Sequence, residues 1–330
     1  MDNIEINKLP KPKVNLLYNG KDCTADFSKY LQSITFTENE EEESDELSLN
    51  ISDYDGYFSD LWYPRKGDKL TCDIIYGNDI FKCGTFTIDD NNFDFTTTGD
   101  YVDIKAIATS TNFSVRTKKA INHSGKTLTQ IANKIGKSYG FKVLGTTGNI
   151  KIGTIVQKNE SDITFLRRVS LQYGYIFNIK DNYLTFIKSE ELGNAKSLFS
   201  LSKSDCSLIH LNDTATKIYG KCKVQYLDLK TNTLKNYIAN GNTEITDILT
   251  IHKRCDSIEE AKHVAEAALK NSHREISGNI TLGKPINNFI AGVNFELNGV
   301  GRFEGKYHIK STQRKVDNSG YKVEGEIIKC

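Results

Sequence analysis

The sequence predicts a mainly β protein of the α+β class, with two similar small antiparallel β-barrels and an α+β insertion domain between them. Three observations support this class. Residues 14–112 and the residues from 206 onward alternate apolar and polar side chains as half-buried strands do, residues 113–195 show helical spacing, and the two β segments resemble each other. We therefore expect the first barrel in residues 1–112, the insertion domain in 113–195 and the second barrel in 196–330.

The first barrel is predicted from short alternating stretches that end at turn residues. Residues 47–51, 70–74 and 85–88 each place apolar side chains at every second position. Gly77-Asn78-Asp79 supplies a turn between the last two stretches. This segment is therefore expected to form an antiparallel sheet with one buried face.

The insertion domain begins with one clear amphipathic helix. Thr127 and Gln130 have the spacing of a capping box, and Gly140 is placed to end the helix. Apolar residues recur between them at helical spacing: Leu128, Ile131, Ala132, Ile135 and Tyr139.

A second helix is expected at 162–173, with Ser161 as its N-cap and Gly174 as its stop. A hairpin of residues 175–179 and 183–187 follows, turning at 180–182. Two helices and short strands make 113–195 a small α+β unit.

The third segment returns to the strand pattern, interrupted by one helix near 257–272. Ser257 and Glu260 have capping-box spacing at the start of that helix. Strands separated by turn residues are expected at 217–226, 236–239, 248–252, 276–282, 293–297, 307–312 and 321–328.

An internal repeat relates segment 66–110 to segment 291–328. In both segments an apolar strand follows a glycine, a second strand follows a Phe and a Gly, and a third begins at a Tyr. The glycines and tyrosines concerned are Gly67, Gly84 and Tyr101 in the first copy and Gly292, Gly305 and Tyr321 in the second. The repeat predicts two similar barrels in one chain. The alternative is two unrelated antiparallel meanders that share turn glycines by chance.

Short motifs in a fixed order carry a family resemblance that covers nearly the whole chain. The motifs are residues 44–53 with Trp62, Pro64 and Lys66-Gly67-Asp68, then Lys126-Thr127-Leu128, Gln157 to Asp162 and Tyr173-Gly174-Tyr175, then Gly278-Asn279-Ile280, Gly305-Lys306-Tyr307 and Ser319-Gly320-Tyr321. In this order they resemble the late control protein D family of phage tail baseplate hub proteins, which is similar to the hub portion of type VI secretion spike proteins.

The resemblance implies a structural role in the baseplate of a phage tail or of a contractile injection particle. It implies a homotrimer whose two barrels per subunit alternate in a six-part ring, joining a threefold spike to a sixfold tail tube. The expected partners are the spike, a tube or tube-initiator protein and the baseplate wedge proteins. The chain ends at Cys330, directly after the second barrel, so the spike is expected to be a separate polypeptide.

Composition argues against several other classes of protein. With 43 basic and 42 acidic residues the net charge is +1, so the field that attracts nucleic acid is absent and no specific nucleic acid is expected. Apolar runs are far shorter than the roughly 20 residues of a membrane span, and the first thirteen residues lack the apolar h-region of a signal peptide. The cysteines are odd in number and form no CxxC pair, so we expect reduced thiols and synthesis in the bacterial cytoplasm.

The sequence offers little that resembles a catalytic or ligand-binding motif. The six histidines form no HExxH and no Cys-His metal spacing, and no GxSxG, GxxxxGK[ST] or GxGxxG follows a strand. We therefore predict a protein that is not an enzyme, with no catalytic, cofactor-binding or metal-binding residues and no cofactor.

Three features nevertheless have functional alternatives. Glu160 and Asp162 have the residue types of a glycosidase acting on cell wall, although their place at a helix start explains them without catalysis. The acidic residues between Glu38 and Glu46 are interpreted as a solvated loop. Tyr173, Tyr175 and Tyr183 either stack on sugars or fill the core, and the alternative function is a tail-associated peptidoglycan-binding or cell-wall-degrading protein.

Overall fold

Most elements of the computed structural model are strands. The structure describes residues 10–40, 44–108, 117–145, 152, 155–180, 183–188, 191, 194–214, 219–228, 231–241, 245–272 and 276–330. The predicted mainly β class with large antiparallel sheets is confirmed. Separate barrels stay a prediction, because the two segments expected to form them share one continuous sheet.

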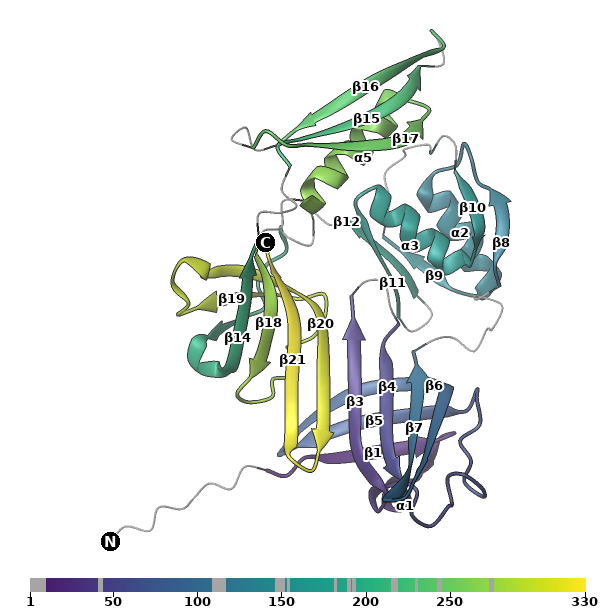
Figure 1. Cartoon of the computed structure of the whole chain (residues 1–330), viewed down its shortest axis with the longest axis vertical. Coiled ribbons are helices and arrows are strands. Elements are labelled where there is room, and N and C mark those ends of the chain that lie inside the picture. The colour runs from purple at the N-terminus through teal and green to yellow at the C-terminus, as the bar shows by residue number, and fades with distance from the viewer. Residues whose placement is uncertain are drawn as a thin grey trace.

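That large sheet crosses the lower half of the molecule (Figure 1). Its strands follow the order β14 (Cys206–Asp213), β18 (Ile276–Leu282), β21 (Gly320–Lys329), β20 (Gly305–Asp317), β3 (Leu31–Asn39), β4 (Glu46–Ser52), β7 (Gly99–Ile107), β6 (Asp79–Thr96), β5 (Lys69–Tyr76), β1 (Lys13–Tyr18) and β2 (Lys21–Asp22). Two further strands join it through β20, namely β19 (Asn294–Asn298) and β13 (Phe199–Ser202). Three short helices lie at its turns, namely α1 (Thr24–Ser28), η2 (Lys203–Asp205) and η3 (Gly301–Phe303).

Two hydrophobic cores lie along this sheet, one for each half. Period-2 alternation turns every second side chain inward, and that inward set fills each core. The first core includes Ile34, Phe36, Leu49, Phe86 and Ile104. The second includes Phe289, Phe295, Tyr307, Ile309 and Ile327.

The insertion between the halves contains the two predicted helices, α2 (Leu128–Tyr139) and α3 (Asp162–Gln172). The capping box is present, because Gln130 N donates to Thr127 Oγ1 over 3.2 Å and Thr127 N donates to Gln130 Oε1 over 3.0 Å. The remaining strands form two small sheets, β8 (Lys119–Asn122) with β10 (Val156–Glu160), and β11 (Tyr175–Lys180), β12 (Tyr183–Lys188) and β9 (Lys142–Leu144). The predicted hairpin turn at residues 181 and 182 lies outside the described residues.

A second insertion, between β14 and β18, contains more than the predicted helix. It forms a sheet of β16 (Thr233–Asn240), β15 (Lys221–Asp228) and β17 (Ile248–Cys255), with α5 (Ile258–Ser272) packed on it. Val264 and Leu269 of α5 belong to the same hydrophobic core as Ile131 and Phe165 of the first insertion. The two insertions therefore share one core in the upper part of the molecule (Figure 1).

Candidate assembly interface

The internal repeat is present in the backbone hydrogen bonds of the two segments. Gly67 N donates to Ile88 O over 2.8 Å, and Gly292 N donates to Ile309 O over the same distance. A β-bulge falls between Ile88 and Asp90 in β6 and between Ile309 and Ser311 in β20. The predicted equivalence of segments 66–110 and 291–328 is therefore confirmed for the described strands.

The equivalence extends further than the sequence pattern indicated. β3 and β4 pair with a bulge between Leu31 and Ser33, and β14 and β18 pair with a bulge between Cys206 and Leu208. The chain order β3, β4, β5, β6, β7 thus repeats as β14, β18, β19, β20, β21, and the strands follow the same spatial order in both halves. One difference is that β1 runs antiparallel to β5, whereas β13 runs parallel to β19.

The two halves are joined edge to edge by the antiparallel pair β20 and β3. Residues 311–317 of β20 face residues 33–39 of β3, with Arg314 opposite Phe36 and Val316 opposite Ile34. Arg314 is 0% exposed and Val316 is 9% exposed. The joint is therefore built from main-chain hydrogen bonds together with side chains withdrawn from water.

Arg314 anchors this joint. Its Nη2 donates to the carbonyl oxygens of Ile286 and Phe289 over 3.0 and 2.9 Å, and its Nη1 donates to the hydroxyl of Tyr321 over 2.9 Å. The guanidinium also lies over the ring of Phe81, which belongs to the other half. One buried cation thus links the loop before β19 with both halves of the sheet.

A second buried polar cluster crosses the joint beside Arg314. His308 Nε2 lies 2.6 Å from Glu40 Oε2, and His308 Nδ1 lies 2.6 Å from Asn294 Oδ1. Glu38 Oε2 accepts from Ala291 N over 3.1 Å. The interpretation of the acidic run as a solvated loop is therefore wrong for Glu38 and Glu40, because both carboxylates are buried against donors of the second half.

Sequence reasoning missed these residues, although a signal was present. Ile34, Phe36, Glu38 and Glu40 share one face of the strand by period-2 alternation. A carboxylate in register with buried apolar residues indicates a buried partner. Residues 41–43 of the acidic run lie outside the described residues.

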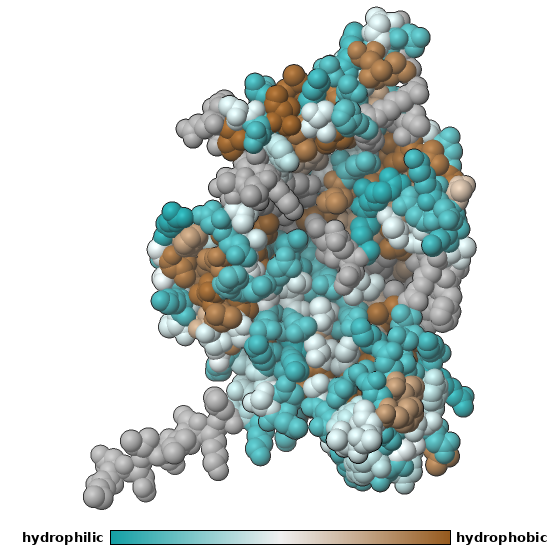
Figure 2. Space-filling model, viewed as in Figure 1, coloured by the Kyte–Doolittle hydropathy of each residue, from teal (hydrophilic) through white to brown (hydrophobic). Residues whose placement is uncertain are grey.

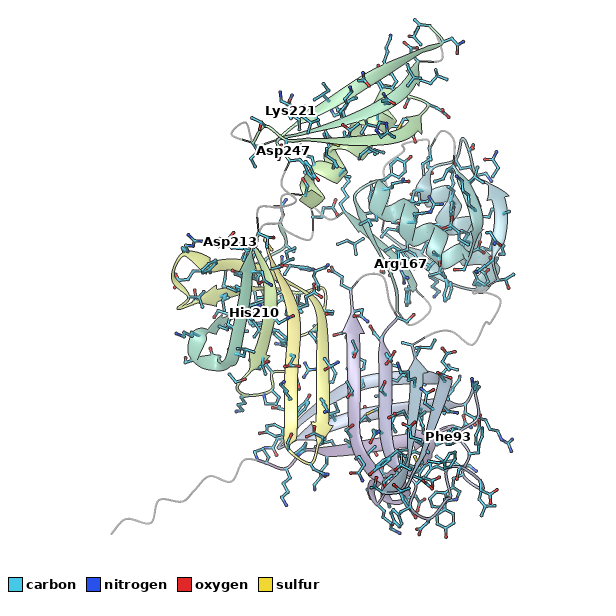
Figure 3. All side chains as sticks on the ribbon, viewed as in Figure 1. Phe93, Arg167, His210, Asp213, Lys221 and Asp247 are labelled. Carbon is cyan, nitrogen blue, oxygen red and sulfur yellow. The ribbon has the colours of Figure 1, made fainter. Side chains whose placement is uncertain are left out.

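Each half has strand edges that no described strand covers, and two of them are long. Residues 90–96 of β6 pair with β7 on one side, while β5 pairs with β6 only up to Thr87. β14 pairs with β18 alone. Figure 3 shows Phe93 of β6 at one side of the molecule and His210 and Asp213 of β14 at the other.

Apolar side chains lie exposed along both edges. Phe95 on β6 is 69% exposed and Leu208 on β14 is 57% exposed. Tyr63, Phe93 and Phe95 form a stacked row, with ring centroids 5.5 and 6.4 Å apart. Figure 2 shows brown patches over both regions. Open strand edges with apolar side chains are templates for pairing with another chain.

The carboxylates weighed as a glycosidase pair are both held by cations. Arg168 donates to Glu160 and lowers its pKa. Burial raises the pKa of Asp162, but hydrogen bonds from Lys119, Tyr139 and Gln157 outweigh it and hold that pKa below its ordinary value. A glycosidase needs one carboxylic acid with a raised pKa. Neither residue meets that requirement.

The tyrosines weighed as a sugar-stacking surface do not form one. Tyr173 and Tyr175 are buried in the core of the insertions, and only Tyr183 is exposed. Tyr173 also donates to Glu260 Oε1 of α5 over 2.5 Å. Two of the three side chains therefore fill the core.

Metal-ligand clusters and membrane-spanning helices are both absent from the described residues. No group of three or more His, Cys, Asp or Glu side chains in the described part is arranged to hold a metal ion. None of the described helices is long and apolar enough to cross a membrane. His273 lies outside the described residues.

Comparisons with known proteins identify the class of fold. No family model matches the chain. The 43 kDa tail protein of prophage MuSo2 from Shewanella oneidensis matches with a TM-score of 0.72 at 15% identity, covering 96% of this chain and 98% of that one. A component of the type VI secretion system from E. coli matches with a TM-score of 0.55 at 10% identity, covering 91% and 74%. The fold is therefore that of phage tail proteins and related secretion components.

Two baseplate hub proteins are similar to the chain in sequence. The probable baseplate hub protein of Escherichia phage 186 is 26% identical over 181 residues, which is 54% of this chain and 45% of that protein. The corresponding protein of Escherichia phage P2 is 28% identical over 181 residues, 54% and 46%. These matches cover less than half of either relative. The predicted resemblance to phage baseplate hub proteins is confirmed.

Proposed function

We propose that the chain is a structural hub of a tail baseplate and acts through its interfaces rather than through catalysis. The observation that carries this proposal is the repeat of one strand arrangement in two halves that are joined edge to edge through β20 and β3. The similarity to the hub proteins of phages 186 and P2 supports it.

Two equivalent halves in one chain provide a way to match different symmetries. Three copies arranged in a ring present six equivalent units, and the insertions mark every second unit, so the ring keeps threefold symmetry as well. A homotrimer of this kind fits a threefold spike on one side and a sixfold tube on the other. The proposed partners are the central spike, the tail tube or its initiator, and the baseplate wedge proteins.

The proposal assigns a role to each segment. Residues 1–112 and 196–330 contribute the two ring units, and residues 113–195 contribute the first insertion. The carboxylates Glu160 and Asp162 are structural in this proposal, because both are engaged by cations. The chain is made in the bacterial cytoplasm and incorporated into a phage tail or a tail-like particle.

A reconstruction of the particle that contains the chain tests this function. The expected result is three copies on the tail axis, with the two halves alternating around it. Six copies around the tube, or any position away from the axis, would contradict the hub proposal.

A further inference from the structure

The hairpin of β5 and β6 brings two cysteines into contact. In this pairing Cys72 lies opposite Gly84 and the next pair is Asp73 with Lys82, so that Cys83 is the extra residue of a β-bulge. A bulge sets two residues of one strand against one residue of its partner. The thiols of Cys72 and Cys83 form a hydrogen bond with each other. Two neighbouring strands therefore hold two thiols side by side.

The geometry of this hairpin fits a disulfide bond. Residues directly opposite each other in an antiparallel pair have Cα atoms roughly 4.5–5.5 Å apart. A disulfide spans Cα separations of about 4.4–6.8 Å. Gly84, with a φ of 109°, provides the backbone conformation that the bulge needs. A bond between the two sulfur atoms is therefore compatible with the strand pairing as it stands.

The two thiols differ in their access to solvent. Cys72 is 0% exposed, whereas Cys83 is half-buried. The hydrogen bond with Cys83 and burial both raise the pKa of Cys72, so that this thiol is protonated in the neutral range. A soluble oxidant therefore reaches Cys83 first, and Cys72 is placed to complete the exchange.

We propose that Cys72 and Cys83 form a dithiol that closes to a disulfide when the chain leaves the reducing cytoplasm. The change of compartment rests on the proposed hub function, because it takes the chain to be carried out of the cell in a particle. Disulfides persist in oxidising surroundings and are rare in the cytoplasm. The expectation of reduced thiols then holds for the cytoplasm, and not for these two residues in a released particle.

The oxidant in this step is a small disulfide such as oxidised glutathione. The Cys83 thiolate attacks one sulfur of that molecule, so that a mixed disulfide forms and one small thiolate leaves. The Cys72 thiolate then attacks the Cys83 sulfur, and the second small thiolate leaves. Two protein thiols are oxidised to one disulfide, one small disulfide is reduced to two thiols, and the two protons pass from the protein thiols to the leaving groups.

The dithiol lies close to the joint between the two halves. Phe81 and Cys83 of β6 both pack against the first core, and the Arg314 guanidinium lies over the Phe81 ring. Burial raises the pKa of Tyr321, and the nearby thiols of Cys83 and Cys72 add to that rise. Tyr321 accepts a hydrogen bond from Arg314. A disulfide at this position therefore braces the strands that contribute Phe81 to the joint.

Peptide mapping of the purified full chain tests the dithiol. A tryptic cleavage site at Lys82 separates the two cysteines, so that Cys72 falls in peptide 70–82 and Cys83 in peptide 83–105. The chain is incubated with oxidised glutathione, its remaining thiols are blocked with N-ethylmaleimide, and it is digested without reductant. We expect one linked species of the two peptides that separates on reduction, at least about ten times as abundant as any other pair of cysteine peptides.

Variants distinguish this pair from the other thiols. Cys83→Ser and Cys72→Ala should each abolish the linked species. Cys23→Ser is the matched control and should leave it unchanged, because Cys23 packs against the same core but donates to Leu16 O over 3.4 Å. Blocking of both Cys72 and Cys83 by the maleimide in the oxidised wild type, or linkage of Cys83 to glutathione alone, would overturn the proposal. That wild-type result does not depend on how well either variant folds.

Mapping of released particles tests the change of compartment. Particles collected from the culture medium and blocked before digestion should contain the linked species, whereas chains blocked inside the cell should give the two free peptides. Free thiols at Cys72 and Cys83 in released particles that contain the chain would overturn the redox transition and leave the hub function standing. Absence of the chain from the particles would contradict the hub function, and the glutathione experiment would still decide the disulfide.

Discussion

The guanidinium carbon of Arg314 lies 3.7 Å from the centroid of the Phe81 ring, so that a residue of the second half stacks on a residue of the first. Arg314 is fully buried, and backbone carbonyls and the Tyr321 hydroxyl accept from its Nη atoms. The guanidinium fixes the relative orientation of the two halves, because a planar group with several N–H donors can stack on the Phe81 ring and bind the carbonyl oxygens at the same time. The joint is therefore a specific contact and not only an apolar one.

Replacing Arg314 should weaken the joint measurably. In Arg314→Leu the carbonyl oxygens of Ile286 and Phe289 lose their donor, so we expect a loss of about 3 kcal/mol in the free energy of unfolding. Urea denaturation followed by Trp62 fluorescence provides the measurement. Lys315→Met, a neighbour on the exposed face, is the matched control and should change stability by less than about 0.5 kcal/mol. Equal midpoints for the two variants would contradict this role.

Much of the fold could be predicted because its signals are local. The capping box of Thr127 and Gln130, the N-cap Ser161 and the glycines of the repeat each act within a few residues. The partners of Arg314 and Glu40 could not be predicted, because charged residues in alternating strands are ordinarily solvent-facing. Glu40 lies against His308 of the other half, and Arg314 stacks on Phe81 of the other half and donates to carbonyl oxygens 25 and 28 residues away. No local pattern indicates partners so far apart in the chain.

The larger repeat was hidden for a different reason. β14 and β18 are separated by a second insertion of about 60 residues, whereas β3 and β4 are adjacent in the chain. The pair β14 and β18 is equivalent to the pair β3 and β4 in its bulge and its backbone hydrogen bonds. Many different amino-acid sequences can form the same bulge and the same hydrogen bonds. Side-chain patterns revealed only the last three strands of each half.

Equivalent glycines in the two halves should be equally intolerant of substitution. Gly84 and Gly305 have φ values of 109° and 129°, a conformation that L-residues rarely adopt. Gly84→Ala and Gly305→Ala should each lower the free energy of unfolding by about 1–2 kcal/mol. Thermal denaturation of both variants provides the comparison. A neutral effect at either position would show that the two hairpins are not conformationally equivalent.

Acid should weaken the insertion through Asp162. Its pKa in the folded chain lies below the ordinary value of 3.8, so the unfolded chain binds more protons in this range. The stabilisation is complete above that value and is lost as pH falls through it toward the folded pKa. Asp162→Asn should therefore be less stable than the wild type at pH 7, and the difference should narrow below about pH 4. Urea denaturation from pH 7 to pH 3 measures it, and a constant difference would contradict the mechanism.

The protein should not bind purified peptidoglycan. Two of the tyrosines that could stack on sugars, Tyr173 and Tyr175, are buried and are unavailable as a binding platform. In a pull-down with insoluble peptidoglycan we expect the chain to remain in solution, alongside a known wall-binding module as positive control. Sedimentation of the chain with the wall material, abolished by Tyr183→Ala, would instead support the cell-wall alternative.

The hydrogen bond between Tyr173 and Glu260 should couple the two insertions. Tyr173 follows α3, Glu260 lies in the first turn of α5, and both side chains are buried. Tyr173→Phe removes the donor and leaves a buried carboxylate oxygen less well satisfied, which should cost about 1–3 kcal/mol. Burial also raises the pKa of Tyr173, so the hydroxyl remains a donor throughout the neutral range.

Hydrogen exchange should show this coupling directly. In Tyr173→Phe we expect faster amide exchange in both α3 and α5, since one hydrophobic core contains residues of both helices. Tyr183→Phe is the matched control, because that ring is 37% exposed, and it should leave both helices protected. Faster exchange confined to α3 would show that the insertions open independently, and the shared core would then contribute little to holding them together.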